Sequence, residues 1–198
     1  MNITESYTIN TAALRVILFD ADGTLRRCTV PGQHCPNDGS EWELFSDVRP
    51  RLRACLQANP RLAFGIVSNQ GGVHSGKLSE DTARQLLEDT ARAAFVHLGA
   101  TASGAPCFPP WAVRYCPHSS QGNCLCRKPS PALLFETAAI FESPSATPIQ
   151  RSECLYVGDL FTDMQAATNA GFHFAWACDF FGRSTPCEGK LQVLSLPG

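Results

Sequence analysis

The sequence predicts an α/β fold, a doubly wound and mostly parallel β-sheet with helices packed on both of its faces. Short apolar runs rich in β-branched and aromatic residues end at polar or glycine residues, which is typical of buried parallel strands. Segments with helical periodicity separate these runs, and strands that alternate with helices form parallel sheets. The main predicted strands cover residues 16–19, 62–69, 154–158 and 172–177.

Three of the predicted strands end in residues that carry charged or hydrogen-bonding groups. Open α/β folds bind their ligands at the C-terminal edge of the sheet, where these strand ends meet. Polar groups from three separate strands therefore predict one shared site at that edge. They are Asp20 and Asp22 after the first strand, Ser68, Asn69 and Gln70 at the end of the second, and Asp159 and Asp163 after the third.

Residues with capping or stop preferences define the ends of the predicted helices. Ser46 or Asp47 caps the first helix and Asn59-Pro60 ends it, whereas Gly99 ends the second. The tail, at about residues 183–198, contains two prolines and is predicted to be irregular. The predicted helices cover residues 48–56, residues 79–98, a segment that begins at Ser130-Pro131, and a segment from Thr162 or Asp163 to Gly171.

The segment at residues 116–126 has the spacing of a metal-binding loop. Three cysteines and one histidine follow the pattern C-x-H-x5-C-x-C, and three thiolates with one imidazole can complete a tetrahedral structural zinc site. Arg127 and Lys128 follow immediately, so a metal-bound loop would fix two positive charges in place. Such charges suit a protein that handles phosphate. The predicted zinc ligands are Cys116, His118, Cys124 and Cys126.

Length and composition limit the class of protein. A chain of 198 residues with 44% hydrophobic content predicts one domain over residues 1–198. The net charge of −2 provides no basic field for nucleic acid. No segment is long and apolar enough for a membrane span, and the N-terminus lacks the pattern of a secretory signal. Seven of the ten cysteines lie outside the metal loop, so we expect reduced thiols in a cytoplasmic protein, with a monomer slightly favoured.

The order of the motifs resembles that of the haloacid dehalogenase superfamily of phosphatases, which use an aspartate nucleophile. D-x-D-G-T-L at residues 20–25, S-N-Q-G-G at 68–72, R-K-P at 127–129 and G-D-x-x-x-D at 158–163 follow the order of that family. The metal loop before R-K-P is similar to that of a zinc-loop branch, which contains histidinol-phosphate phosphatases and D-glycero-D-manno-heptose bisphosphate phosphatases. The resemblance covers residues 14–176 and implies a Rossmann-like core.

The resemblance implies a role for each polar residue of the shared site. Asp20 would attack phosphorus to form an aspartyl-phosphate, and Asp22 would act as general acid and base. Lys128 would stabilise the charge of the transition state. A catalytic Mg²⁺ would be bound by Asp20, Asp159 and the backbone carbonyl of Asp22, while Asp163 would orient its waters or Lys128. The residues implied to bind phosphate or substrate are Ser68, Asn69, Gln70 and Arg127.

The spacing of the motifs leaves no room for a large cap domain. Only residues 26–45 are free between the first strand and the first helix, which is enough for a flap. The flap and the zinc loop would form the walls of an open site. Cys28, His34 and Cys35 of the flap are candidates for part of a second metal site, although no fourth ligand is evident nearby.

We therefore expect a Mg²⁺-dependent phosphatase for a small-molecule phosphate monoester, with D-glycero-D-manno-heptose 1,7-bisphosphate as the leading substrate. Ala21 stands where members of this group usually carry Arg, and the flap matches neither subgroup, so histidinol phosphate is an alternative. A polynucleotide 3′-phosphatase shares the chemistry and the open site, although the mildly acidic charge argues against it. The non-enzyme alternative is a catalytically silent, zinc-stabilised binding module, against which the full set of predicted catalytic residues argues.

Overall fold

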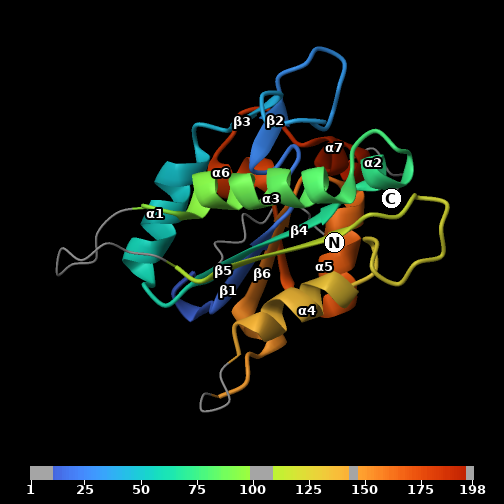
Figure 1. The fold of residues 1–198 in the computed structure, drawn as a ribbon. Coiled ribbons are helices and arrows are strands. Elements are labelled where there is room, and N and C mark those ends of the chain that lie inside the picture. The colour runs from blue at the N-terminus through green and yellow to red at the C-terminus, as the bar shows by residue number, and fades with distance from the viewer. Residues whose placement is uncertain (1–10, 99–108, 143–146, 195–198) are drawn as a thin grey trace.

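The computed structural model describes residues 11–98, 109–142 and 147–194, and it confirms the predicted α/β fold (Figure 1). Five parallel strands form one sheet in the order β5-β4-β1-β6-β7. The chain builds the sheet outward from β1 in one direction and then in the other, so a topological switch point lies beside β1. The strands are β1 Val16–Phe19, β4 Ala63–Asn69, β5 Trp111–Cys116, β6 Cys154–Gly158 and β7 His173–Trp176.

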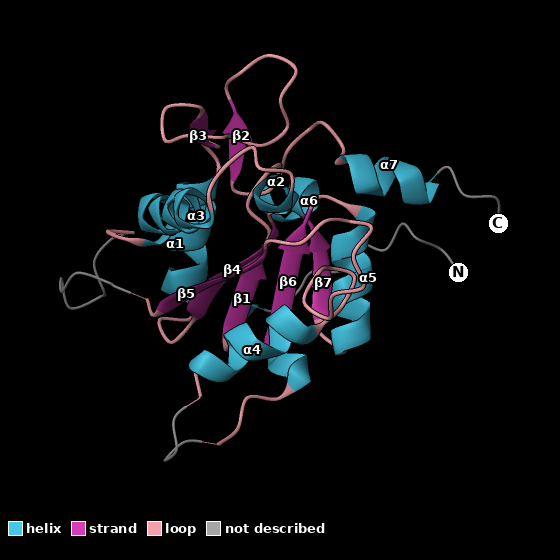
Figure 2. Ribbon diagram, turned by 45° about the vertical axis from the view of Figure 1, so that its right-hand side comes forward, coloured by secondary structure: helices cyan, strands magenta, loops and turns pink. Residues whose placement is uncertain are grey.

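Alternate residues of β1 pack against different helices on the two faces of the sheet. Ile17 and Phe19 share a core with α1, α3 and α6, whereas Val16 and Leu18 share a core with α4 and α5 (Figure 2). Burial on both faces explains why this strand is apolar throughout. The helices are α1 Val48–Ala58, α2 Gly71–His74, α3 Glu80–Phe95, α4 Ala132–Ile140, α5 Phe161–Ala170, α6 Ala177–Phe181 and α7 Glu188–Leu194, with short 3₁₀ turns at Thr11–Ala13 and Arg151–Glu153.

The second predicted helix ends earlier than its periodicity suggested. α3 stops at Phe95, whereas the sequence predicted helix as far as Leu98 and a stop at Gly99, which lies outside the described residues. The backbone leaves the helical conformation at Val96, which is extended, and His97 has a φ of +55°. Arg49 of α1 donates to the carbonyl oxygens of Val96 (3.0 Å) and His97 (2.8 Å), so these carbonyls are satisfied without a further helical turn.

The tail is less irregular than predicted. Residues 188–194 form α7, while residues 195–198 lie outside the described part of the chain. The N–H of Gly189 donates to the carbonyl oxygen of Asp159 (2.9 Å), and a side chain at this glycine would overlap the backbone of Phe161. This contact between distant parts of the chain anchors the start of α7, and sequence periodicity could not reveal it.

The predicted flap forms a two-stranded antiparallel sheet above the C-terminal edge of the main sheet (Figure 1). β2 Arg26–Cys28 pairs with β3 Trp42–Leu44. The N–H of Phe45 donates to the carbonyl oxygen of Leu25 (3.0 Å), which ties the base of the flap to the loop after β1. Among the described residues, no helix is long and apolar enough to cross a membrane.

Candidate active site

Three aspartates meet at the C-terminal edge of the sheet. Asp20 follows β1, Asp159 follows β6, and Asp163 lies in the first turn of α5. β1 and β6 are paired with Phe19 opposite Val157, so both strands end at the same level. One carboxylate oxygen from each aspartate lies within 4.8 Å of the others. The structure thus brings these three predicted site residues together, and we call them the acidic cluster.

Lys128 contacts two members of the acidic cluster. Its Nζ lies 2.7 Å from Oδ1 of Asp20 and 2.7 Å from Oδ1 of Asp163. It also donates to the hydroxyl of Tyr156 (2.8 Å) and to the carbonyl oxygen of Val67 (3.1 Å), and its side chain is buried. Three carboxylates and one ammonium therefore share a small volume, and the excess negative charge favours the binding of a further cation.

Burial and repulsion change the protonation of the acidic cluster. Burial raises the pKa of Asp20 to about 6 despite the opposing attraction of Lys128, and the charge of Asp163 adds to the rise. Burial also raises the pKa of Asp159 to about 8, with further repulsion from Asp20 and Asp163. Burial lowers the pKa of Lys128, but the attraction of the Asp163 and Asp20 carboxylates outweighs it and the net shift is upward. Lys128 is therefore charged at neutral pH.

Asp163 also shapes the loop that carries Asp159. Its Oδ2 accepts hydrogen bonds from the backbone N–H groups of Asp159 (3.2 Å) and Leu160 (2.9 Å). The side chain is fully buried, and a Cβ at Gly158 would overlap it. A carboxylate at the first turn of α5 is also favoured by the positive end of the helix dipole. Asp163 therefore fixes Asp159 through the backbone and contacts Lys128 through its other oxygen.

Asp22 lies between two side chains that donate hydrogen bonds to it. Nε2 of Gln70 donates to Oδ2 of Asp22 (3.1 Å) and to the hydroxyl oxygen of Ser68 (3.0 Å). On the other side, Nε of Arg26 donates to Oδ1 of Asp22 (2.8 Å). The structure therefore links three predicted site residues, and it adds Arg26, which the sequence motifs did not single out.

Asn69 binds the segment that follows the metal loop, and Arg127 of that segment binds the backbone of the loop itself. The side chain of Asn69 accepts from the backbone N–H of Lys128 (3.0 Å) and donates to the Lys128 carbonyl oxygen (3.2 Å). Nη1 of Arg127 donates to the carbonyl oxygen of His118 (2.8 Å). Both predicted binding residues thus hold protein backbone in this structure, and Asn69 sets the position from which Lys128 reaches the acidic cluster.

The turn after Asp20 contacts the acidic cluster closely. The hydroxyl of Thr24 donates to Oδ1 of Asp159 (2.9 Å), and Gly23 has a φ of +80° with no space for a Cβ beside Asp159. Arg183 donates to the carbonyl oxygens of Gly23 (3.1 Å) and Thr24 (2.8 Å). It also pairs with Asp47 (2.8 Å), which was predicted to cap α1 but makes no capping bond with its side chain. The sequence carried no signal for Arg183.

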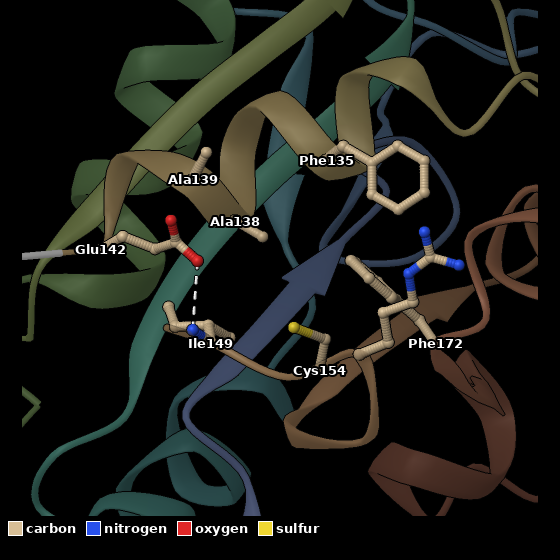
Figure 3. A pocket seen from close by; sticks show the side chains of 8 residues that line it. Phe135, Ala138, Ala139, Glu142, Ile149, Cys154 and Phe172 are labelled. Atoms are coloured by element: carbon tan, nitrogen blue, oxygen red, sulfur yellow. Dashed lines mark hydrogen bonds between the residues drawn. The ribbon is translucent and has the colours of Figure 1, made fainter. Parts of the chain in front are cut away.

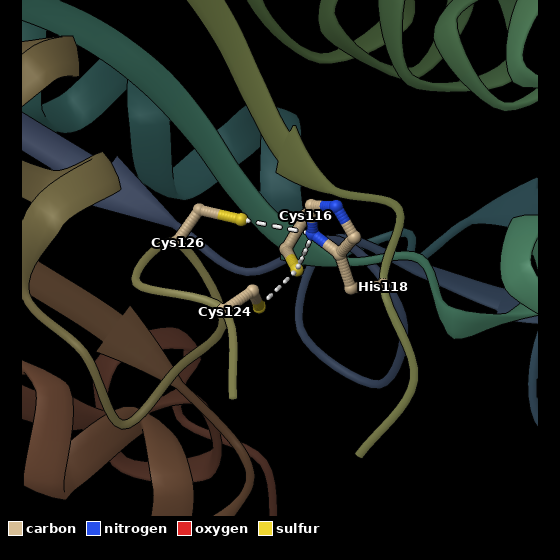
Figure 4. A group of neighbouring side chains, drawn as sticks. All are labelled: Cys116, His118, Cys124 and Cys126. Carbon is tan, nitrogen blue, oxygen red and sulfur yellow. Dashed lines mark hydrogen bonds between the residues drawn. The ribbon is translucent and has the colours of Figure 1, made fainter. Parts of the chain in front are cut away.

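The four predicted zinc ligands lie together at the end of β5 (Figure 4). Nδ1 of His118 is 3.5 Å from Sγ of Cys116 and 3.2 Å from Sγ of Cys126. Sγ of Cys124 is 3.5 Å from Sγ of Cys116, and one ligand atom from each residue lies within 4.8 Å of the others. We call this group the thiol cluster, and its donor set can hold a metal ion.

The flap cysteines belong to neither cluster, although burial and the charges of Asp22 and Asp20 raise the pKa of the Cys35 thiol, which lies near Asp22. Among the described residues, the groups of possible metal ligands include neither Cys28 nor Cys35, and His34 belongs to none of them. Both flap cysteines are free thiols, Cys28 partly buried and Cys35 exposed. Cys107, predicted to be a reduced thiol, lies outside the described part of the chain.

A cavity of about 210 Å³ lies at the other edge of the sheet (Figure 3). Cys154 lines it at the start of β6, whereas Asp159 follows the end of that strand. Phe135 of α4 forms another part of the wall, with the Arg151 guanidinium 5.2 Å from the centre of its ring. The cavity is therefore remote from the acidic cluster and belongs to neither metal-ligand group.

Comparison with known proteins identifies the family. The family model described as polynucleotide kinase 3 phosphatase matches residues 15–180, a range that contains both clusters. The chain belongs to this family. A D-glycero-β-D-manno-heptose-1,7-bisphosphate 7-phosphatase of Bordetella bronchiseptica is 24% identical, and the match covers 90% of this chain and 88% of that protein.

Further relatives agree with the predicted haloacid dehalogenase resemblance, which is confirmed. A Helicobacter pylori protein of the same heptose bisphosphate phosphatase name is 28% identical, and this match covers only 53% of each chain. The crystal structure of D,D-heptose 1,7-bisphosphate phosphatase from B. bronchiseptica, complexed with magnesium and phosphate, superposes with a TM-score of 0.60 at 22% identity. It covers 89% of this chain and 90% of that one, and this likeness supports the fold.

Proposed function

We propose that the protein is a Mg²⁺-dependent phosphatase that hydrolyses a small-molecule phosphate monoester through an aspartyl-phosphate. The observation that carries this proposal is the Lys128 ammonium, buried 2.7 Å from both Asp20 and Asp163. It lies beside the proposed nucleophile, where the charge of a transferring phosphoryl group would develop. Because relatives along most of the chain are named as heptose bisphosphate phosphatases, D-glycero-D-manno-heptose 1,7-bisphosphate is the leading substrate.

The proposed reaction has two steps. A carboxylate oxygen of Asp20 attacks phosphorus while the bond from phosphorus to the leaving oxygen breaks, and this oxygen takes a proton from the carboxylic acid form of Asp22. Water then attacks the phosphorus of the aspartyl-phosphate and transfers a proton to the Asp22 carboxylate. Inorganic phosphate leaves and Asp20 is regenerated as the carboxylate. Lys128 interacts with the phosphoryl oxygens in both steps, and Ser68 and Gln70 provide hydrogen-bonding groups beside Asp22.

The acidic cluster fits a magnesium ion. Its donors are carboxylate oxygens, which hard divalent cations prefer, and it carries more negative charge than Lys128 neutralises. Asp20, Asp159 and the carbonyl oxygen of Asp22 are the proposed ligands. Asp163 accepts a hydrogen bond from the backbone N–H of Asp159 and so fixes the position of that ligand. Bound Mg²⁺ would neutralise charge on the phosphate and so allow the anionic Asp20 to approach.

The thiol cluster fits a structural zinc ion. Three sulfur atoms and one imidazole nitrogen form a complete tetrahedral donor set, and the two clusters have no residue in common. Lys128 follows Cys126 by two residues, so a loop ordered by zinc would help to hold the Lys128 ammonium beside Asp20. We therefore assign zinc a structural role, with Cys116, His118, Cys124 and Cys126 as ligands.

A second candidate function is the removal of 3′-phosphates from polynucleotides. The description of the matching family favours it, and the flap leaves a site without a large cap domain. The net charge of −2 is a poor match for a phosphate backbone. Oligonucleotide substrates therefore belong in the first assay beside sugar phosphates.

Phosphate release across a substrate panel tests the proposed function. The panel contains heptose bisphosphate, histidinol phosphate, other sugar phosphates and 3′-phosphorylated oligonucleotides, each measured with Mg²⁺ and with a chelator. We expect Mg²⁺-dependent release that is highest for heptose bisphosphate. In the Asp20→Asn variant we expect a loss of at least about 10³-fold with folding and zinc content unchanged.

The outcomes of the panel separate the candidate functions. A preference for the oligonucleotides would replace the sugar phosphate assignment with the polynucleotide one. Equal release by the wild type and the Asp20→Asn variant on every substrate would refute the phosphatase proposal and favour a zinc-stabilised binding module. Mg²⁺-independent release would overturn the assignment of the acidic cluster to magnesium.

A further inference from the structure

Arg26 is a buried cation whose carboxylate partner is Asp22. Its Nε lies 2.8 Å from Oδ1 of Asp22 and its Nη2 lies 3.4 Å from Oδ2, so the guanidinium approaches both oxygens. Arg26 has no exposed surface, whereas the side chain of Asp22 is 11% exposed. Removing a guanidinium from water is costly unless it is paired, so its placement here needs compensation by specific contacts.

The other face of the guanidinium is anchored to α3. Nη1 of Arg26 donates to the hydroxyl of Thr90 (2.9 Å) and to the carbonyl oxygen of Leu86 (3.0 Å). Thr90 is fully buried, and its own hydroxyl donates to the Leu86 carbonyl oxygen (2.7 Å). The guanidinium is therefore fixed at both ends, by a rigid helix and by the Asp22 carboxylate.

The backbone of the turn also keeps Arg26 beside Asp22. The N–H of Gly23 donates to the carbonyl oxygen of Arg26 (2.9 Å), and the N–H of Arg26 donates to the carbonyl oxygen of Ala21 (3.0 Å). Arg26 is also the first residue of β2, so the same residue begins the flap and binds the Asp22 carboxylate. Because Gln70 donates to Oδ2, the carboxylate of Asp22 accepts hydrogen bonds from side chains on two sides.

We infer that Arg26 is a positioning residue for proton transfer, which holds Asp22 in the orientation needed to protonate the leaving group. This inference rests on the proposed phosphatase function. Arg26 acts through Asp22, since its own donors are taken up by Asp22, Thr90 and Leu86. A small displacement of the acid lowers the rate of a step that requires its proton, whereas a step that requires no proton is unaffected.

Leaving-group dependence separates this role from a general structural one. An alkyl phosphate expels an alkoxide that needs a proton, whereas p-nitrophenyl phosphate expels a phenolate that is stable without one. The comparison uses kcat/KM, which reports the transfer of the phosphoryl group to Asp20 and not the later hydrolysis that both substrates share. We expect Arg26→Lys, which keeps the charge but loses the planar fork, to lower kcat/KM for a sugar phosphate by about 10²-fold. For p-nitrophenyl phosphate we expect a change in kcat/KM within about threefold, because protonation of the leaving group contributes little there.

Two further variants keep the test interpretable if Arg26→Lys folds poorly. Thr90→Val removes one anchor of Arg26 and retains the volume of the side chain, so we expect a loss of about threefold to tenfold for the sugar phosphate only. Arg183→Lys is the matched control, because Arg183 binds the backbone of the same turn at Gly23 and Thr24 without touching the Asp22 carboxylate. We expect that variant to lower the rates for both substrates equally.

The outcomes distinguish this inference from the function on which it rests. If wild-type protein releases phosphate from neither substrate above the Asp20→Asn background, the proposed function fails. If wild-type protein is active but Arg26→Lys and Thr90→Val lower both rates by the same factor, Arg26 serves the fold and the positioning role is wrong. Thermal unfolding of each variant, measured in the same buffer, shows how much of any common loss comes from folding.

Discussion

The two candidate metal sites of this protein are built in opposite ways. The acidic cluster joins Asp20 to Asp159 and Asp163, more than a hundred residues away, and two of its three residues are buried. The thiol cluster uses four residues within the segment 116–126, of which Cys116 alone is buried. One cluster therefore depends on the topology of the sheet, whereas the other is almost entirely local.

The two clusters therefore depend on different parts of the molecule for their order. The acidic cluster is held by the core, because β1 and β6 fix the level of its residues, and a conservative substitution there should leave the fold intact. The thiol cluster closes a loop in which only Cys116 is buried, so a bound metal would supply much of the order of that loop. Lys128 connects the two clusters, because it follows the metal loop in the chain and its ammonium pairs with Asp20.

The largest effect that tests this comparison is expected for Asp159→Asn. The substitution removes one charge from the proposed Mg²⁺ ligands and keeps the shape of the side chain, including an acceptor for Thr24. We expect turnover to fall on the order of 10³-fold, with partial recovery at high Mg²⁺ concentration. Metal analysis should find the zinc content unchanged, because the two clusters share no ligand. Loss of zinc together with activity would show that the clusters are not independent.

A smaller effect on turnover is expected for Cys124→Ser. The hydroxyl is a poor substitute for a thiolate, so the variant should lose zinc, unfold at a lower temperature and become more sensitive to proteolysis within residues 116–126. We expect turnover to fall by up to about 10²-fold, because Lys128 is placed less accurately while the acids remain in position. Unchanged zinc content would contradict the ligand assignment. Unchanged turnover after zinc loss would show that Asn69 and the buried partners of the ammonium position Lys128 without the metal.

The contrast between the clusters also explains what could be predicted from the sequence. The thiol cluster was predicted in full, because C-x-H-x5-C-x-C is a local pattern and metal chemistry demands those residue types. The sheet and the convergence of Asp20 with Asp159 were predicted as well, since apolar runs that end in acids give both the strands and the edge at which they meet. The C-cap Gly171, in the left-handed conformation, was correct for the same local reason.

The contacts that were missed depend on geometry that no local pattern encodes. Tyr156 lies within a run read as a buried strand, and only the structure shows its hydroxyl 2.8 Å from Lys128. Arg183 comes from a tail predicted to be irregular, yet it binds the turn after Asp20. Arg26 was predicted only as the first residue of the flap, and its pairing with Asp22 becomes visible once the tight turn between the two residues is formed. Tyr156 and Arg183 meet their partners across the fold and Arg26 meets Asp22 through the turn, so periodicity and spacing do not reveal these contacts.

The smallest effect concerns the pH dependence of stability without metal. The pKa of Asp159 is about 8 in the folded protein, against 3.8 for an unperturbed carboxyl, so the folded state retains a proton that the unfolded state releases between these values. Stability must therefore fall as pH rises through that window, and the raised pKa of Asp20, about 6, adds to the fall. We expect the Tm in chelator to decrease between pH 5 and pH 8 by several degrees, at roughly 2–4 °C per kcal/mol.

Asp159→Asn provides the matched comparison, because the amide imitates the protonated acid. The variant and the wild type should have similar Tm values at pH 5, and the variant should be more stable at pH 8 in chelator. Mg²⁺ should reverse that order at pH 8, since the ion binds more tightly to, and so stabilises more, the protein that supplies the carboxylate. The Cys124→Ser variant should keep this pH response despite its lower Tm. If the wild-type Tm changed between pH 5 and pH 8 by the same amount as the Tm of Asp159→Asn, Asp159 would be ionised throughout that range, and Lys128 would already relieve the repulsion within the acidic cluster.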